Sequence, residues 1–285
     1  MSTSVSFLET MLTNYIGIPI FIAGTVGNLL NILVFTSLRT FRQSSSVISL
    51  TFMSALNIGQ LMSGLLPRLL NTLFSINGTE SSLFYCKFRP YIFHVCTVSS
   101  LSCLCLAAFD QYCATCSYRR LQNWCNIQLA KRLEIANLIT WMLHGIPYLV
   151  LFYHNVSPTT NKVTCVSTDF IFAQYRSYVI VLCLLGIVPV SIATVLALMA
   201  YYNIQQLPRR TIPLARRELD KQLTRMVLIQ VIVNIFTIVP HTIVNTILTI
   251  PNLISSSDLQ KIFQFIASLT LLNYYLYFTV SMRQF

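Results

Sequence analysis

The feature that most constrains the fold is a series of long apolar stretches, separated by short clusters of charged and turn-forming residues. A helix needs about 20 mostly apolar residues to cross the roughly 30 Å hydrocarbon core of a bilayer. Seven stretches of about this length occur, at approximately 15–38, 47–70, 84–116, 133–153, 178–202, 223–248 and 261–280. The composition agrees, because 55% of the 285 residues are hydrophobic and 9% are charged, against about 25% charged in soluble domains. The chain is therefore predicted to cross a membrane repeatedly.

The apolar stretches are predicted to be helices. Backbone amides in lipid find no water, so spanning segments form helices or the strands of a closed barrel. Barrel strands alternate polar and apolar residues, and these stretches do not. We predict an all-α membrane protein with a single domain over residues 1–285, built as a seven-helix bundle. We see no internal repeat and no soluble domain.

The distribution of cations predicts the orientation. With the N-terminus outside the cell, 13 of the 19 lysines and arginines fall on the inner side and 6 on the outer side. This bias is typical of cytoplasmic loops. The basic segments then lie beside anionic lipid, and loops this short at a bilayer argue against nucleic-acid binding.

Two glycosylation sequons are consistent with that orientation. Asn77-Gly-Thr and Asn155-Val-Ser both fall in loops assigned to the outside, where such sequons are acceptors. We expect glycosylation at Asn77 and at Asn155, although Pro158 after the second sequon is expected to hinder its use.

The cysteines divide in the same way. Of the nine, only Cys86 and Cys165 lie on the predicted outer side, where an oxidising compartment favours a disulfide between them. Cys113-x-x-Cys116 has no second cysteine or histidine pair nearby, which argues against a zinc or redox site. The four histidines are scattered without ligand spacing. We therefore predict no metal, no cofactor and no enzymatic activity.

Several motifs occur in a fixed order along the predicted helices. They are Gly27-Asn28, Cys86, Asp110-Gln111-Tyr112, Trp141, Pro189, Pro240 and Asn273-Tyr-Tyr-Leu-Tyr277. In their order and spacing they resemble the rhodopsin-like, or class A, G-protein-coupled receptors, of which this chain looks like a divergent, peptide-receptor-like member. Cys86 lies 25 residues before Gln111, the separation expected between the bridging cysteine and the middle residue of the Asp-Arg-Tyr motif.

The resemblance implies roles at the cytoplasmic end, where Asp110, Gln111 and Tyr112 close the third helix. Gln111 replaces an arginine, so the charged, forked geometry of guanidinium is lost. Asp220 on the sixth helix matches the acid that often locks the resting state, and we expect a hydrogen bond from Gln111 to it. In a competing interpretation, Asp110 bonds only Tyr112 or Arg119 and holds the helix end.

In the middle of the bundle, Asn57 stands where the family has an acid, with Ser100 as its polar neighbour. Sodium sensitivity is therefore expected to be weak. Asn273 and Tyr277 match the switch motif of the seventh helix. For Asn28, Asn57 and Asn273, plain interhelical packing and a water-linked switch both remain open.

A ligand pocket is implied between the third, fifth, sixth and seventh helices. Resemblance places there Phe93, His94, Thr97, His241, Asn245 and Phe263, with Arg68 and Gln264 nearby. Arg68 either lines the pocket or snorkels to the interface, and His94 and His241 either bind ligand or bond each other. Phe93 in place of an acid argues against a biogenic amine, and Ala267 in place of a lysine argues against retinal. A basic mouth with aromatic lining favours a peptide or an acidic small molecule.

The sequence thus predicts a multi-pass plasma-membrane receptor that binds an extracellular ligand and signals to a heterotrimeric G protein. One alternative is a decoy or scaffold receptor that does not signal, which Gln111 supports. The other is a small-molecule transporter, which needs a charged mid-membrane site and usually internal symmetry; the sequence shows neither.

Overall fold

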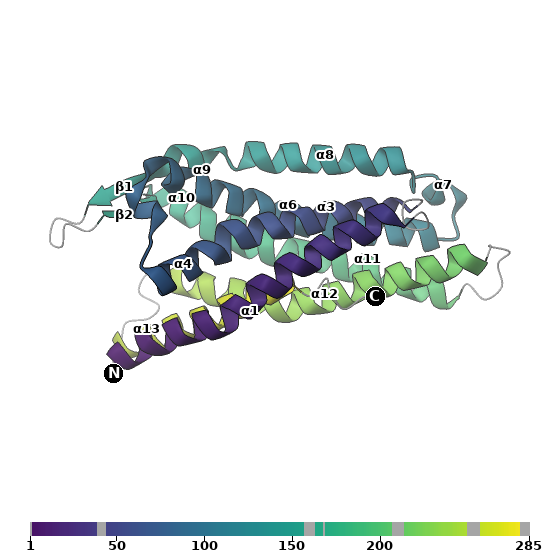
Figure 1. Cartoon of the computed structure of the whole chain (residues 1–285). Coiled ribbons are helices and arrows are strands. Elements are labelled where there is room, and N and C mark those ends of the chain that lie inside the picture. Colours follow the sequence, from purple (N-terminus) through teal and green to yellow (C-terminus); the bar gives the residue numbers. More distant parts are fainter. Residues whose placement is uncertain are drawn as a thin grey trace.

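The computed structural model describes residues 2–38, 44–156, 163–167, 169–206, 214–249 and 257–279. It shows a bundle of long helices with a small hairpin at one end (Figure 1). The elements are α1 (Ser2–Ser37), α3 (Ser45–Gln60), η1 (Leu61–Leu65), α4 (Leu66–Phe74), α5 (Gly78–Ser81), α6 (Leu83–Thr115), α7 (Arg119–Gln122), α8 (Ile127–His144), α9 (Ile146–Leu151), β1 (Phe152–Val156), β2 (Val163–Ser167), α10 (Phe170–Tyr175), η2 (Arg176–Ile187), α11 (Val188–Gln205), α12 (Leu214–Thr249) and α13 (Ser257–Tyr277).

Helix occupies most of the described part of each predicted apolar stretch, and the stretch 133–153 ends in the strand β1. Within the described residues, five spans are long and apolar enough to cross a membrane: Phe7–Ser37, Ser45–Phe74, Leu83–Thr115, Phe170–Gln205 and Glu218–Thr249. In α13 the apolar part is shorter, Ile262–Tyr277, and α8 carries Lys131, Arg132 and Glu134 within its 18 residues. The predicted helical membrane bundle is confirmed.

Several helices begin earlier than the apolar pattern indicates, because polar caps set their first turns. The side chain of Asn126 accepts a hydrogen bond from the amide of Gln128 at 2.9 Å, so α8 begins before residue 133. Asp169 accepts from Ile171 at 2.9 Å and starts α10. Hydropathy finds the part of a helix in lipid, whereas caps define its end.

The first helix extends well beyond its predicted start at residue 15. α1 begins at Ser2, and its outer part lies along α13 (Figure 1). There the hydroxyl of Ser268 donates a 3.0 Å hydrogen bond to the carboxylate of Glu9. A contact with a distant helix holds this extension in place.

A two-stranded hairpin, which the sequence did not predict, covers one end of the bundle. β1 and β2 pair antiparallel, with His154 opposite Cys165. The predicted disulfide is present and joins Cys165 to Cys86 on α6, and His154 bonds the carbonyl of Thr79 at 2.8 Å. We call this end, which also holds the N-terminus, the outer end (Figure 1); α7 lies at the opposite, inner end.

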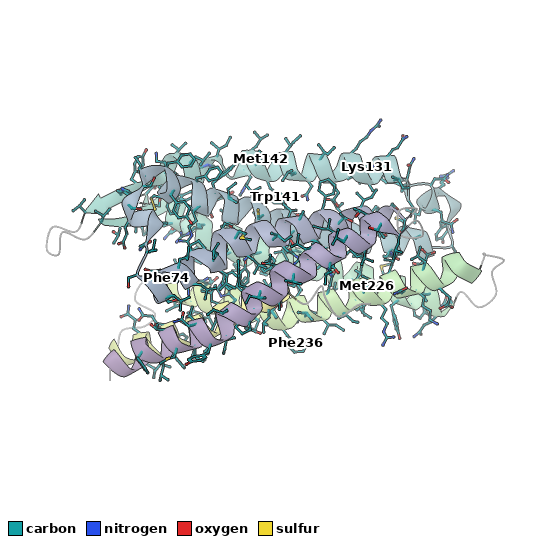
Figure 2. All side chains as sticks on the ribbon, in the orientation of Figure 1. Phe74, Lys131, Trp141, Met142, Met226 and Phe236 are labelled. Carbon is teal, nitrogen blue, oxygen red and sulfur yellow. A yellow bond between two sulfur atoms is a disulfide. The ribbon has the colours of Figure 1, made fainter. Side chains whose placement is uncertain are left out.

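The bundle is apolar outside and partly polar inside. α6 is central, and its residues Leu101, Leu104 and Ala107 are fully buried. Phe236 is 71% exposed, and Figure 2 shows it and Met142 pointing away from the bundle. Trp141 points inward and donates to Ser102 at 3.0 Å. Such an apolar exterior suits a lipid environment.

Candidate functional site

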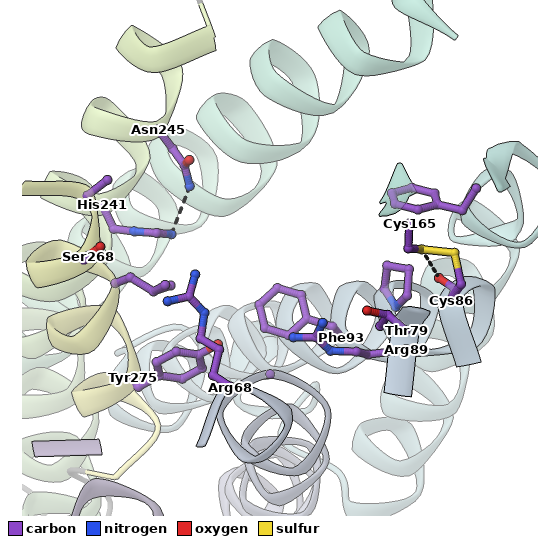
Figure 3. Close-up of a pocket in the computed structure, with 15 residues that line it drawn as sticks. Arg68, Thr79, Cys86, Arg89, Phe93, Cys165, His241, Asn245, Ser268 and Tyr275 are labelled. Atoms are coloured by element: carbon purple, nitrogen blue, oxygen red, sulfur yellow. Dashed lines mark hydrogen bonds between the residues drawn. A yellow bond between two sulfur atoms is a disulfide. The ribbon is translucent and has the colours of Figure 1, made fainter. Parts of the chain in front are cut away.

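A cavity of about 400 Å³ lies at the outer end. α4 and α6 contribute Arg68, Arg89 and Phe93 to its wall, and α12 contributes His241 and Asn245 (Figure 3). The disulfide and Phe152 of β1 also line it, so the hairpin forms part of its rim. The volume falls in the range of about 300–1,000 Å³ typical of small-ligand sites.

A second cavity of about 310 Å³ adjoins the first and shares Pro90, Phe93 and Asn245 with it. It extends the space toward His94, Thr97 and the π-helical segment η2. Arg68, Phe93, His94, Thr97, His241 and Asn245, all predicted from the sequence, therefore line one or both cavities. Their role in binding remains a prediction.

Phe263, predicted to lie along the pocket, and Gln264, predicted near it, are not among the residues that line either cavity, and their role in binding stays a prediction. The face of α13 that reaches the first cavity carries Ala267, Ser268, Leu271 and Tyr275. Gln264 is exposed one turn farther out on that helix, and Phe263 is half-buried. The rotation of α13 decides which residues face inward, and the apolar pattern alone does not define it.

Two arginines share the first cavity. Arg89 was not predicted as a site residue, although it follows Cys86 by three positions and precedes Phe93 by four, a spacing that places all three on one helix face. Its Nε donates a 3.0 Å hydrogen bond to the carbonyl of Ser63. That carbonyl lacks its usual helical donor because Pro67, four residues on, has no N–H. Proline in one helix thus creates the acceptor that orients an arginine of another.

The two predicted pocket histidines do not bond each other. His94 Nε2 lies 3.0 Å from Nδ1 of His144, whose Nε2 lies 2.9 Å from the Tyr175 hydroxyl. His241 bonds Asn245 at 3.2 Å on its own helix. Each therefore has its own partners, because the two belong to different walls of the paired cavities.

A neutral amide network occupies the middle of the bundle. Asn28 donates to the carbonyls of Gly24 and Phe278, both at 2.7 Å. Asn57 donates to Asn28 Oδ1 at 3.3 Å and accepts from the hydroxyl of Ser100. The network joins α1, α3 and α6 to the end of the seventh helix with no charged member.

The seventh helix makes a second contact of this kind. Asn273 donates a 3.0 Å hydrogen bond to the carbonyl of Phe236 on α12. Tyr277 is buried, and within the described part of the chain its hydroxyl has no hydrogen-bond partner. The same holds for both polar side-chain atoms of Asn234, a fully buried residue that we did not predict.

At the inner end, the side chain of Gln111 bonds Ser46 and Thr224, and the expected hydrogen bond to Asp220 stays a prediction. Its amide nitrogen donates to Ser46 Oγ at 2.9 Å, and Thr224 donates to its carbonyl oxygen at 3.0 Å. Asp220 lies one turn before Thr224 on α12.

Asp110 takes side-chain hydrogen bonds from α3. The hydroxyls of Ser45 and Ser46 both donate to its Oδ2, the latter at 2.7 Å. Ser46 thus links Asp110 to Gln111, and Tyr112 lies half-buried beside them. We call the hydrogen bonds among Ser46, Asp110, Gln111 and Thr224 the inner latch, because they join α3, α6 and α12.

A buried acid in α8 was also missed. Glu134 is 1% exposed, and its Oε2 accepts from the thiol of Cys103 at 2.9 Å. Its place among the first residues of a predicted span was the available signal, because intramembrane acids are rare. Across the described residues, no group of three or more histidines, cysteines or acids could hold a metal ion.

The two sequons lie at the outer end. Asn155 is exposed on β1, and Ser157 of its sequon lies outside the described residues. Asn77 is half-buried, and its side chain accepts a 2.6 Å hydrogen bond from Thr79. Glycosylation of both remains a prediction.

A helical membrane bundle with a disulfide-bound rim, an outward cavity and a polar cluster at the opposite end has the architecture of a membrane receptor. The sequence matches the profile of the family described as 7 transmembrane receptor (rhodopsin family) over residues 27–277. The chain therefore belongs to the rhodopsin family of seven-transmembrane receptors. A comparison with curated proteins found no match.

Proposed function

We propose that the protein is a plasma-membrane receptor that binds an extracellular ligand, a peptide or an acidic small molecule, in the paired outer cavities and activates a heterotrimeric G protein. One observation carries this proposal. The helix α12 lines the cavity through His241 and Asn245 at one end and belongs to the inner latch through Thr224 at the other.

Ligand binding acts by shifting a conformational equilibrium. A ligand favours an open inner end only as far as it binds that form more tightly than the closed form. Contacts with His241 and Asn245 on α12 and with Phe93 on α6 allow such a preference, because they respond to the separation of the two helices. Opening breaks the bond between Thr224 and Gln111, which costs about 0.5–1.5 kcal/mol and is within reach of a small ligand.

The proposal is tested by a screen of peptides and small carboxylic acids against cells that express the full chain, with G-protein dissociation as the readout. Activation by a ligand, lost when His241→Ala and Asn245→Ala are combined, is the expected result. Matched surface expression of the variant is required. Binding without G-protein activation would contradict the signalling step.

A decoy receptor is the second candidate, and Gln111 is the observation in its favour. The neutral side chain lies inside the inner latch, where the family pattern has a guanidinium that meets the G protein. If an identified ligand binds the wild type without activating any G protein, and Gln111→Arg restores activation, the decoy function holds.

A further inference from the structure

The two arginines of the first cavity also line a neighbouring cavity. Arg68, Arg89 and Thr79 line the first cavity and also a neighbouring outer cavity of about 580 Å³. Figure 3 shows the side chain of Arg68 extending into the space between Tyr275 and Phe93. A ligand that enters from the outer end therefore meets both guanidinium groups.

Among the described residues, their charge has no counterpart in the cavity walls. None of the described residues that line the three outer cavities is acidic, and a third arginine, Arg176, lines the second cavity. Within the described residues, neither Arg68 nor Arg89 forms an ion pair. The nearby carboxylate of Glu9 on α1 accepts a hydrogen bond from Ser268. Cations gathered in a partly desolvated space without an anion are unfavourable, so an incoming anion gains from both.

The geometry also prepares one arginine for binding. The hydrogen bond from Arg89 Nε to Ser63 fixes the guanidinium and leaves its terminal nitrogens for a second acceptor. A planar guanidinium binds a carboxylate through two parallel hydrogen bonds. Arg68 is exposed and adapts its position to the ligand. Preorganisation of one partner lowers the entropic cost of binding.

We propose that Arg68 and Arg89 form a carboxylate clamp and that the ligand of this receptor presents a carboxylate next to an apolar group. The apolar group fits the side of the cavity lined by Phe93, Leu271 and Tyr275. The proposal rests on the proposed function, because it names the ligand chemistry of the same cavity. A peptide with a free C-terminus and a small carboxylic acid share this chemistry.

The test uses four probes on purified full-length receptor in lipid nanodiscs. They are 3-phenylpropionate, its uncharged amide, the peptide Ala-Ala-Phe with a free C-terminus, and the same peptide amidated. Dissociation constants are measured from the ligand-induced rise in melting temperature. At least one acid is expected to stabilise the receptor, and its amide is not. Binding of 3-phenylpropionate indicates a small carboxylic acid as the ligand, whereas binding of the free peptide alone indicates a peptide C-terminus.

The variants are Arg68→Gln, Arg89→Gln, Arg89→Lys and the control Lys87→Gln, which removes a cation of α6 that lines none of the three outer cavities. Each glutamine in the clamp is expected to weaken acid binding by about tenfold or more, since one partner of a charge pair is lost. Arg89→Lys keeps the charge and restores part of the affinity. The control is expected to bind like wild type.

Arg68→Gln keeps the test valid if Arg89→Gln fails to fold, because the side chain of Arg68 makes no hydrogen bond to the described residues. Equal binding of acids and amides, no stabilisation by any acid, or unchanged acid binding by a folded Arg68→Gln variant would overturn the clamp. These results are separate from the receptor function. Activation by an uncharged ligand refutes only the clamp, whereas acid binding without G-protein activation refutes only the signalling.

Discussion

The side-chain amide of Asn273 on α13 donates to the carbonyl of Phe236 on α12 at 3.0 Å. Pro240 follows Phe236 by four residues and has no N–H, so this carbonyl lacks its helical donor. An unsatisfied carbonyl in lipid is expensive. Asn273 therefore supplies the hydrogen bond that the proline removes, and it ties α13 to α12 at this point.

We expect Asn273→Ala to destabilise the receptor by about 1–3 kcal/mol, because the Phe236 carbonyl is then unsatisfied. In a Pro240→Ala background the helix provides its own N–H donor, so the same substitution is expected to have a much smaller effect. Melting temperatures of the four proteins of this double-mutant cycle measure the coupling. Purely additive effects would show that Asn273 acts independently of the proline.

The inner latch is expected to hold the inactive form. Thr224→Val removes the hydroxyl that bonds Gln111 while keeping the side-chain shape, so we expect basal G-protein activation to rise about two- to tenfold. Thr237→Val is the matched control, because Thr237 is buried on the same helix and bonds only the carbonyl of Val233. Nucleotide exchange without ligand is the measurement. An equal rise in both variants would argue against the latch.

The amide network predicts a response to sodium that can be introduced by mutation. Asn57→Asp places a second carboxylate oxygen 3.3 Å from Asn28 Oδ1, where the wild type has an amide donor. Two facing oxygens and a buried charge favour a cation between them. We expect the variant to melt at a higher temperature in sodium chloride than in choline chloride of equal ionic strength, and the wild type to show no difference.

Ser100 provides the control for this effect. Its hydroxyl bonds Asn57 and would serve as an oxygen ligand for the cation. Adding Ser100→Ala to Asn57→Asp is therefore expected to reduce the sodium-dependent gain. If the gain is the same in both, the cation does not bind at this position.

The features that could be predicted from the sequence are properties of a single segment, or follow from the cellular compartment in which a residue lies. Apolar length located the helices, and the outer position of Cys86 and Cys165 was enough to pair them. The bond between Gln111 and Thr224 could not be predicted in this way, because the residue of α12 that faces Gln111 depends on how two helices are offset. The residues of α13 that face the first cavity depend in the same way on helix rotation. Hydropathy carries no information on either quantity.

The disulfide between Cys86 and Cys165 is expected to stabilise both the rim of the cavity and the whole receptor. It closes a loop across 79 residues, and loss of such a bridge typically costs about 2–5 kcal/mol. Cys86→Ser, Cys165→Ser and the double variant should melt at equally reduced temperatures, because each removes the same bond. Cys183→Ser, which changes a free and half-buried cysteine, should melt like the wild type. A double variant clearly less stable than either single one would show that the two thiols contribute separately.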